Sequence, residues 1–198
     1  MFANRYTAFI DACVLVSTLR RNLLLTLAEA EFFRIRWSAE VLGETQRAIE
    51  GILLKKGTPA DEAASKALRA VAAMQKAFEE AKVQDFENLV CACHGMPDEK
   101  DIHVLAAALK TQAATIVTEN LKDFPSTVLE PLNLEARSAD DFIADTIALD
   151  TGRAIAAIRI MRERLKRPER SAEDLLLDME AAGLVATVDV LRPHMSSL

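Results

Sequence analysis

The chain has 198 residues, and its 24 Lys and Arg against 30 Asp and Glu give a net charge of −6 at pH 7. An apolar content of 51% excludes a disordered chain, and no apolar run reaches the roughly 18 residues that a membrane-spanning helix requires. With three cysteines, an odd number, and no signal-peptide pattern at Met1–Tyr6, we expect a cytoplasmic protein without a disulfide framework.

The first part of the chain alternates strand and helix patterns. Tyr6–Ile10 is a β-rich run that ends directly before Asp11, and Leu19–Glu31 has Leu and Ala at helical spacing. Phe32–Trp37 alternates apolar and basic residues, which predicts a second strand. Ser38 is a good N-cap, so the next helix is expected to begin there.

The same alternation continues along the chain. Thr58, followed by a proline and two acids, predicts a capped helix that runs to about Glu80. Asn88–Cys93 is a short apolar run that we interpret as a strand. Ile102–Leu109 is helical in pattern, and Thr115–Thr118 is a short buried strand. Strands that alternate with helices predict an α/β fold with a parallel sheet.

From Ser138 onward only helix signals occur, with caps at Ser138, Asp150 and Ser171. We therefore predict two regions, an α/β domain over residues 1–137 and a small all-helical C-terminal region over residues 138–198.

Acidic and amide residues stand at the ends of the predicted strands and at the starts of the helices. They are Asp11, Glu44, Asp98, Asp101, Asn120 and Asp123. In an open parallel sheet the carboxyl ends of the strands and the following helix N-termini share one rim, where these side chains would converge. Crowded carboxylates repel one another unless a hard cation neutralises them, and oxygen ligands favour magnesium or manganese. Taken singly, each acid could instead be a helix N-terminal or turn residue.

Two other groups are ambiguous. Cys91, Cys93 and His94 suggest zinc, but a closed zinc site needs four ligands and no second cysteine pair exists, so buried cysteines are the better interpretation. His103 could touch a substrate phosphate or be an ordinary half-buried histidine.

Two basic patterns could bind nucleic acid. Arg34 and Arg36 should face one side of the second strand, as an RNA-facing strip or as a charged sheet edge. A second run in the C-terminal region could contact RNA, dock an acidic partner or simply be solvated, and two of its members, Arg162 and Lys166, have the spacing of one helix face. Its members are Arg159, Arg162, Arg164, Lys166, Arg167 and Arg170.

Four segments in order resemble the PIN domain, a family of metal-dependent ribonucleases that includes the VapC toxins of bacterial toxin–antitoxin pairs. They are Phe9–Leu15, Ser38–Glu44, Asp98–Ala108 and Ile116–Pro125. The resemblance covers about residues 5–130 and implies a PIN-like parallel sheet flanked by helices. The region after residue 137 resembles the helical tail of some longer VapC-like proteins.

The resemblance implies an acidic quartet that holds Mg²⁺ or Mn²⁺, with one accessory acid and two supporting polar residues. These are Asp11, Glu44, Asp101 and Asp123, then Asp98 as accessory ligand, then Thr118 and Asn120 as support. Gly43 departs from the family pattern because it interrupts a region that is usually continuous helix.

The activity implied is hydrolysis of RNA phosphodiester bonds by an endoribonuclease that is the toxin of a type II toxin–antitoxin pair. Its partners would be the RNA substrate, a cognate antitoxin protein and a second copy in a homodimer. Two alternatives remain open: a housekeeping RNA-processing nuclease without antitoxin, and a catalytically silent PIN-like binding module. The presence of all four acids argues against the silent module.

Overall fold

A computed structural model describes residues 6–166 and 169–198. Its centre is a five-stranded sheet of order β3-β2-β1-β4-β5 in which every pair is parallel. The strands are β1 (Thr7–Ile10), β2 (Arg34–Ser38), β3 (Lys82–Val83), β4 (Thr115–Val117) and β5 (Glu135–Arg137). In the register, Phe9 of β1 lies between Arg36 and Ile116. All strands therefore end at one side, which we call the carboxyl edge.

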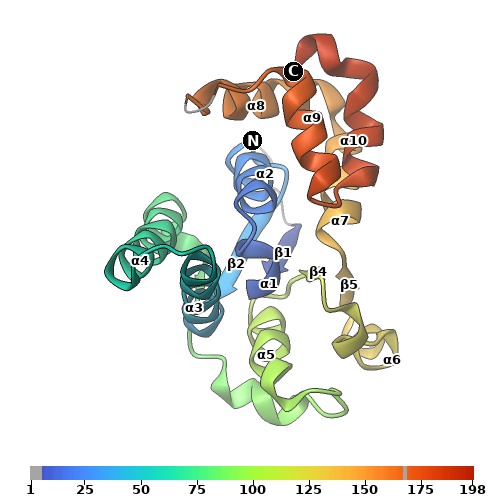
Figure 1. Ribbon diagram of the computed structural model, residues 1–198. Coiled ribbons are helices and arrows are strands. Elements are labelled where there is room, and N and C mark those ends of the chain that lie inside the picture. The colour runs from blue at the N-terminus through green and yellow to red at the C-terminus, as the bar shows by residue number, and fades with distance from the viewer. Residues whose placement is uncertain (1–5, 167–168) are drawn as a thin grey trace.

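Ten helices surround this sheet in the described part of the chain. They are α1 (Ala12–Leu15), α2 (Thr18–Glu29), α3 (Ala39–Lys55), α4 (Ala60–Ala77), α5 (Ile102–Lys110), α6 (Ser126–Leu129), α7 (Ala139–Leu149), α8 (Thr151–Arg164), α9 (Ala172–Ala181) and α10 (Val185–Leu191). Figure 1 shows α5 on one side of the sheet and α2 on the other, with α3 and α4 as a hairpin beside β2. No helix in residues 6–166 and 169–198 combines the length and apolar character needed to cross a membrane.

The two central strands are buried along their whole length. Every residue of β1 and β4 is buried, as expected for parallel strands that are covered on both faces. Phe9 and Ile116 have no exposed surface and lie beside the equally buried Trp37 and Leu105 in one hydrophobic core. This core fixes the positions of the strand ends and therefore of the polar residues that follow them.

The α/β prediction is confirmed, and several of the predicted N-caps are present. Ser38 Oγ accepts a hydrogen bond from the Val41 N–H at 3.2 Å, and Ser171 forms a full capping box with Asp174. α3 runs without interruption through Gly43, so the glycine does not break the helix.

Other predictions of local structure were wrong. Thr58 does not cap α4, because Pro59 occupies the N-cap position and makes no side-chain hydrogen bond there, and the helix ends at Ala77. Residues 88–93 are not a strand, because Glu87–Ala92 forms a 3-10 helix, η2, that packs against α5. A short apolar run has no periodicity that separates these alternatives.

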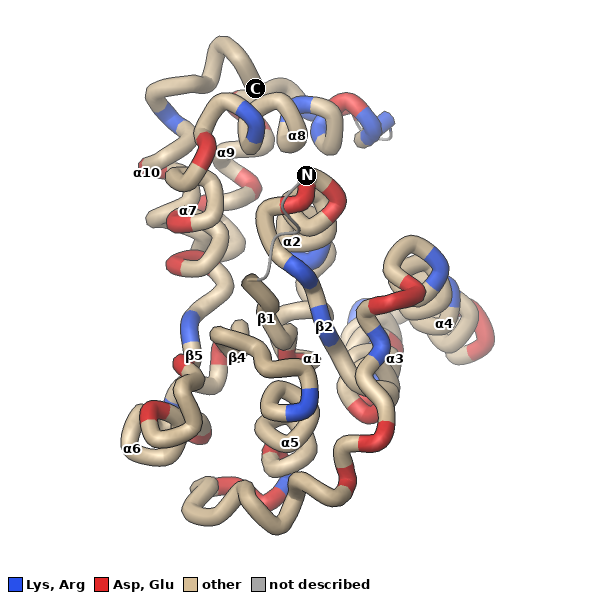
Figure 2. The backbone as a smooth tube through the Cα atoms, turned by 180° about the vertical axis from the view of Figure 1, so that it is seen from behind, with Lys and Arg blue, Asp and Glu red and all other residues tan. Residues whose placement is uncertain are grey.

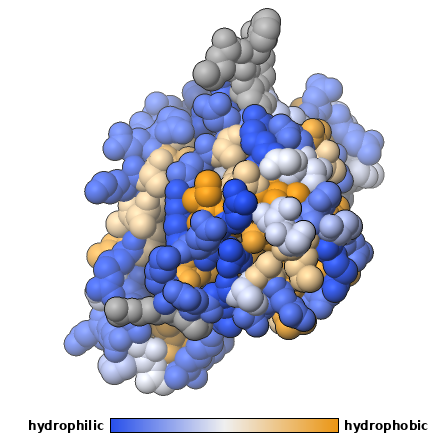
Figure 3. All heavy atoms as spheres, turned by 90° about the horizontal axis from the view of Figure 1, so that it is seen from above, coloured by the Kyte–Doolittle hydropathy of each residue, from blue (hydrophilic) through white to orange (hydrophobic). Residues whose placement is uncertain are grey.

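The helical C-terminal region, here called the extension (residues 138–198), packs on α2. Both α7 and α8 contact α2 (Figure 1). Buried residues of the sheet domain and of the extension belong to one hydrophobic core. The predicted division after residue 137 falls in the single-residue link between β5 and α7. Seen from above, the molecule is mainly hydrophilic with separate apolar patches (Figure 3). The division into two domains, residues 1–137 and 138–198, stays a prediction.

Candidate functional site

The carboxyl edge begins with Asp11, the residue that follows β1. It is the N-cap of α1, and its Oδ1 accepts a hydrogen bond from the Ala12 N–H at 2.6 Å. Only 7% of Asp11 is exposed, so its second oxygen also needs hydrogen-bond partners from the protein. Oδ2 accepts hydrogen bonds from Thr118 Oγ1 at 2.7 Å and from Cys13 Sγ at 3.0 Å. Both oxygens are thus held in fixed directions.

Thr118 follows β4 and joins two parts of the edge. Besides donating to Asp11, its hydroxyl accepts a hydrogen bond from the Asn120 N–H at 3.0 Å. The Asn120 side chain in turn donates from Nδ2 to Asp123 Oδ2, within the turn that contains the short 3-10 helix η4 (Leu121–Asp123). The structure therefore places Thr118, Asn120 and Asp123 in one hydrogen-bonded loop next to Asp11. We call residues 118–123 the rim loop.

Asp101 is a carboxylate at this edge whose pKa is clearly shifted. It ends the 3-10 turn η3 (Glu99–Asp101) and stands at the N-cap of α5, and its Oδ2 is buried without a hydrogen-bond partner. Burial, together with the negative charges of Asp11, Asp98 and Asp123, raises the pKa of Asp101 to about 6, while His103 acts in the opposite direction. Each of the three other aspartates is therefore close enough to Asp101 to repel its charge.

Glu44 lies in the second turn of α3 and meets a residue of α5. Its Oε1 is 3.3 Å from Nε2 of His103, whose ring nitrogens are buried without a well-formed hydrogen bond. The sequence did not predict this approach, because the two residues lie on different helices. Asp98 is engaged locally, since its Oδ1 accepts the Lys100 N–H at 2.9 Å as the cap of η3.

The donor set at the carboxyl edge fits a hard divalent cation in its chemistry. It consists of carboxylate oxygens, one of them buried and unpartnered, which is the environment that favours magnesium or manganese. Within residues 6–166 and 169–198, however, no three His, Cys, Asp or Glu side chains already surround a common metal position. The carboxylates share the edge without closing on one point.

Cys13 contributes contacts to the carboxyl edge that were not predicted from the sequence. Besides its contact with Asp11, its Sγ accepts the Glu119 N–H at 3.3 Å and lies 3.4 Å from Thr118 Oγ1. Burial and the charge of Asp11 raise the pKa of the Cys13 thiol to about 12, so the thiol stays protonated and can act as a donor. Its position two residues after Asp11 was the available signal.

Arg34 and Arg36 do not lie beside the acidic residues. Arg34 starts β2, and its N–H donates to Tyr6 O at the opposite edge of the sheet, about 13 Å of strand away from Ser38. Arg36 is half-buried and donates from Nη1 to Ile35 O. Figure 2 shows the basic positions of β2 on the part of the strand nearer to α2.

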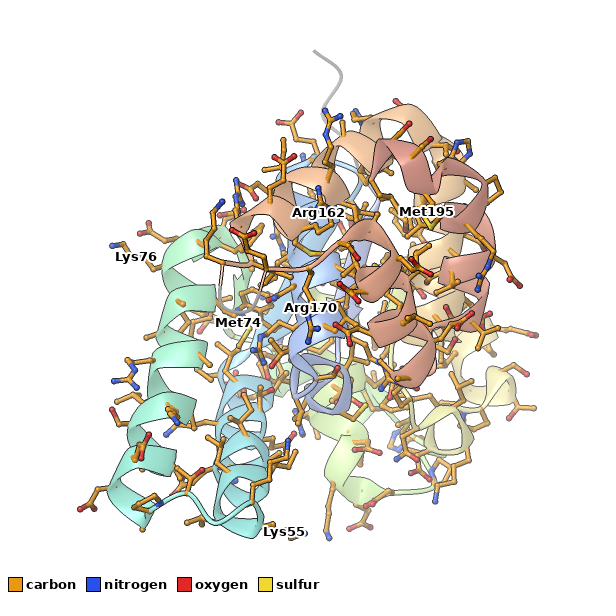
Figure 4. All side chains as sticks on the ribbon, turned by 45° about the horizontal axis from the view of Figure 1, so that its top comes forward. Lys55, Met74, Lys76, Arg162, Arg170 and Met195 are labelled. Atoms are coloured by element: carbon orange, nitrogen blue, oxygen red, sulfur yellow. The ribbon has the colours of Figure 1, made fainter. Side chains whose placement is uncertain are left out.

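The basic run of the extension is largely paired. Arg162 Nη1 donates to the Arg170 carbonyl at 2.7 Å, which joins the last turn of α8 to the link that precedes α9 (Figure 4). Arg170 also pairs with Asp178, and Arg164 pairs with Glu29 of α2. Lys166 lies beyond the end of α8, so the predicted shared helix face with Arg162 was wrong, and Arg167 lies outside the described residues.

The three residues considered for zinc, Cys91, Cys93 and His94, differ in solvent exposure. Cys91 is exposed and Cys93 is buried, and both are free thiols on or just after η2. His94, next to them, is exposed. No zinc-like grouping that includes them occurs in the described part of the chain.

Comparison with known proteins identifies the class. The family model described as "PIN domain" matches residues 7–122, more than half of the chain, and the one described as "VapC50 C-terminal domain" matches residues 139–193. The chain therefore belongs to the PIN domain family. It is 50% identical over 50 residues to the Mycobacterium tuberculosis protein named "Putative ribonuclease VapC50". That match covers 25% of this chain and 30% of the relative's length. No solved structure gives a significant match.

Proposed function

We propose that the protein is a metal-dependent endoribonuclease that hydrolyses RNA phosphodiester bonds at the carboxyl edge. The observation that carries the proposal is the buried, unpartnered Oδ2 of Asp101, whose pKa is raised to about 6 by burial and the surrounding aspartates. Carboxylates that repel one another in the free protein are stabilised when a cation binds between them. The PIN domain match and the name of the relative support RNA as the substrate class.

In this proposal each side chain has a definite task. Asp11 and Asp101 hold Mg²⁺ or Mn²⁺ directly, Glu44 and Asp123 complete the set, and Asp98 is an accessory ligand. When bound, the cation polarises the scissile phosphate and lowers the pKa of an attacking water. Thr118 and Asn120 keep the ligand carboxylates oriented through the hydrogen bonds described above.

The biological setting that fits these similarities is a toxin of a type II toxin–antitoxin pair. The extension matches a domain named after VapC50, and the relative bears the same name. We further propose a cytoplasmic location, a cognate antitoxin protein as partner and assembly as a homodimer. The extension would be a second domain, residues 138–198, beside a nuclease domain of residues 1–137. A housekeeping nuclease remains the alternative, and growth arrest on expression separates the two.

The test is a cleavage assay on mixed cellular RNA with purified full-length protein. We expect internal cleavage with Mn²⁺ or Mg²⁺ and none with excess chelator, with activity restored when metal is added back. A preparation of the Asp101→Asn variant, purified in parallel, controls for contaminating ribonuclease. Cleavage that is equal in chelator and in metal would refute metal dependence, and no cleavage under any condition would favour the silent binding module.

A further inference from the structure

Glu119, the second residue of the rim loop, connects this loop to the extension. Its N–H donates to Cys13 Sγ, so the backbone is held on the Asp11 side of the edge. Its carboxylate points to the extension, where Oε1 accepts a hydrogen bond from the Ala139 N–H at 3.2 Å. Ala139 is the first residue of α7, and a carboxylate is favoured at the positive end of a helix dipole. One residue therefore contacts both the site and the extension.

Arg20 of α2 joins the same carboxylate to another helix of the extension. Its Nη1 lies 3.8 Å from Glu119 Oε1, and its Nη2 donates to the carbonyl of Ala182 at 2.7 Å. Ala182 is the C-cap of α9, where a cation is favoured by the helix dipole. Arg20 itself stands in the first turn of α2, where the dipole disfavours a cation. Local helix preference therefore does not account for Arg20, whereas the tertiary contacts do.

The consequence concerns the two neighbours of Glu119. Thr118 supplies the hydroxyl that orients Asp11, and Asn120 binds both Thr118 and Asp123. Residue 119 lies between them, so its side-chain contacts with Ala139 and Arg20 hold the chain at a position next to both. The extension is thus in contact with the rim loop at the residue that links Thr118 to Asn120.

We propose that Arg20 and Glu119 are positioning residues through which the extension holds the rim loop in the geometry that presents Asp11 and Asp123. The proposal rests on the proposed function, and it assigns a role to the extension that is separate from binding RNA or an antitoxin. It concerns the ligand residues of the site, not the reaction itself.

A second ion pair provides a matched control. Arg164 of α8 and Glu29 of α2 are 3.2 Å apart, so this pair also ties the extension to α2. Its two side chains are about 60% exposed and pair with each other, and in the described part of the chain neither has a hydrogen bond or ion pair to the rim loop. If the Arg20–Glu119 and Arg164–Glu29 pairs only held the extension on α2, breaking either pair would change stability alone.

The experiment compares full-length wild type with Glu119→Ala, Glu119→Gln and Arg20→Ala, and with Glu29→Ala as control. Amide hydrogen exchange of the peptide that covers residues 116–124 is measured without metal, and Mn²⁺ affinity is measured by calorimetry. We expect roughly tenfold faster exchange in this peptide and about tenfold weaker Mn²⁺ binding for Glu119→Ala and Arg20→Ala. Glu119→Gln, which keeps an acceptor for Ala139, should lie between them and wild type. Glu29→Ala should lower only the unfolding temperature.

Two outcomes would overturn the proposal. Either the rim loop exchanges at the wild-type rate in Glu119→Ala and Glu119→Gln, or exchange accelerates equally over the whole chain. Glu119→Gln decides the matter if Arg20→Ala fails to fold. Should wild type bind no Mn²⁺, the proposed function fails, whereas the exchange data still decide whether the two residues position the loop.

Discussion

The carboxyl edge and the extension differ in how fully their carboxylates are balanced by cationic partners. In the extension most carboxylates described have a cationic or backbone partner, as in the pairs Arg137–Asp145, Arg170–Asp178 and Arg192–Glu180. At the carboxyl edge Asp11 and Asp98 also accept backbone N–H groups. The charges that act most strongly on Asp101, however, are those of other aspartates, and its buried oxygen has no hydrogen-bond partner.

This difference separates stability from function. Each pair of surface charges contributes only about 0–1 kcal/mol to stability. Such pairs also carry no special chemistry. Several carboxylates held together at a partly buried edge destabilise the folded chain, so their arrangement points to a ligand that compensates them. Regions where charge is left unbalanced are therefore better guides to the site than regions where charge is most abundant.

The largest expected effect comes from removing one charge of the edge. Asp11→Asn or Asp101→Asn should lower metal-dependent RNA cleavage at least about 100-fold, because each removes a proposed direct ligand. Cleavage rates at saturating Mn²⁺ measure this loss. Asp145→Asn, which changes a paired carboxylate of the extension, is the control and should stay within about twofold of wild type. Equal rates for both edge variants and wild type would show that the assignment is wrong.

The second effect is on stability and has a definite pH dependence. The folded pKa of Asp101, about 6, lies above its ordinary value of 3.8, so the folded protein binds protons more tightly than the unfolded chain. This group therefore destabilises the fold increasingly as pH rises from about 4 to about 6, and fully above that. Without metal, Asp101→Asn should unfold a few degrees higher than wild type at pH 8 and with little difference near pH 4.

Calorimetric or fluorescence melting in chelator gives these differences. Added Mn²⁺ should reverse the order at pH 8, since only wild type keeps the full ligand set. A variant that is less stable than wild type at pH 8 in chelator would mean that Asp101 has a stabilising partner.

The smallest effect concerns the opposite edge of the sheet. Arg34→Glu together with Arg36→Glu should weaken RNA binding about twofold to fivefold and reduce its salt dependence. The reason is that an RNA that extends several nucleotides beyond the cleaved phosphodiester reaches β2. Cleavage at saturating RNA and Mn²⁺ affinity should not change, since neither arginine contacts the carboxyl edge. Fluorescence anisotropy over a salt series measures the first effect. A large loss of the maximal rate would place RNA differently from this proposal.

Some parts of the site followed from local sequence patterns. Asp11, Asp101 and Asp123 were predicted to meet because they occupy strand ends and helix starts, and parallel strands bring such positions to one edge. The structure places Asp11, Asp98 and Asp123 within electrostatic reach of Asp101. The short strands β3 and β5 were missed, because two or three residues carry no readable alternation.

The sequence by itself determined the alternation of β1, β2 and β4 with helices, several N-caps and the edge on which the acids lie. These depend on apolar periodicity and on residues at element ends, which act over a few positions. Only the tertiary structure decided that Thr118 bonds to Asp11 across 107 positions, that Glu44 approaches His103 and that Arg20 joins Glu119 to α9. Such contacts depend on how separately formed elements pack, and one of them, from Arg20 to Ala182, uses a backbone C=O group, which every residue has. No spacing rule along one chain can therefore distinguish them.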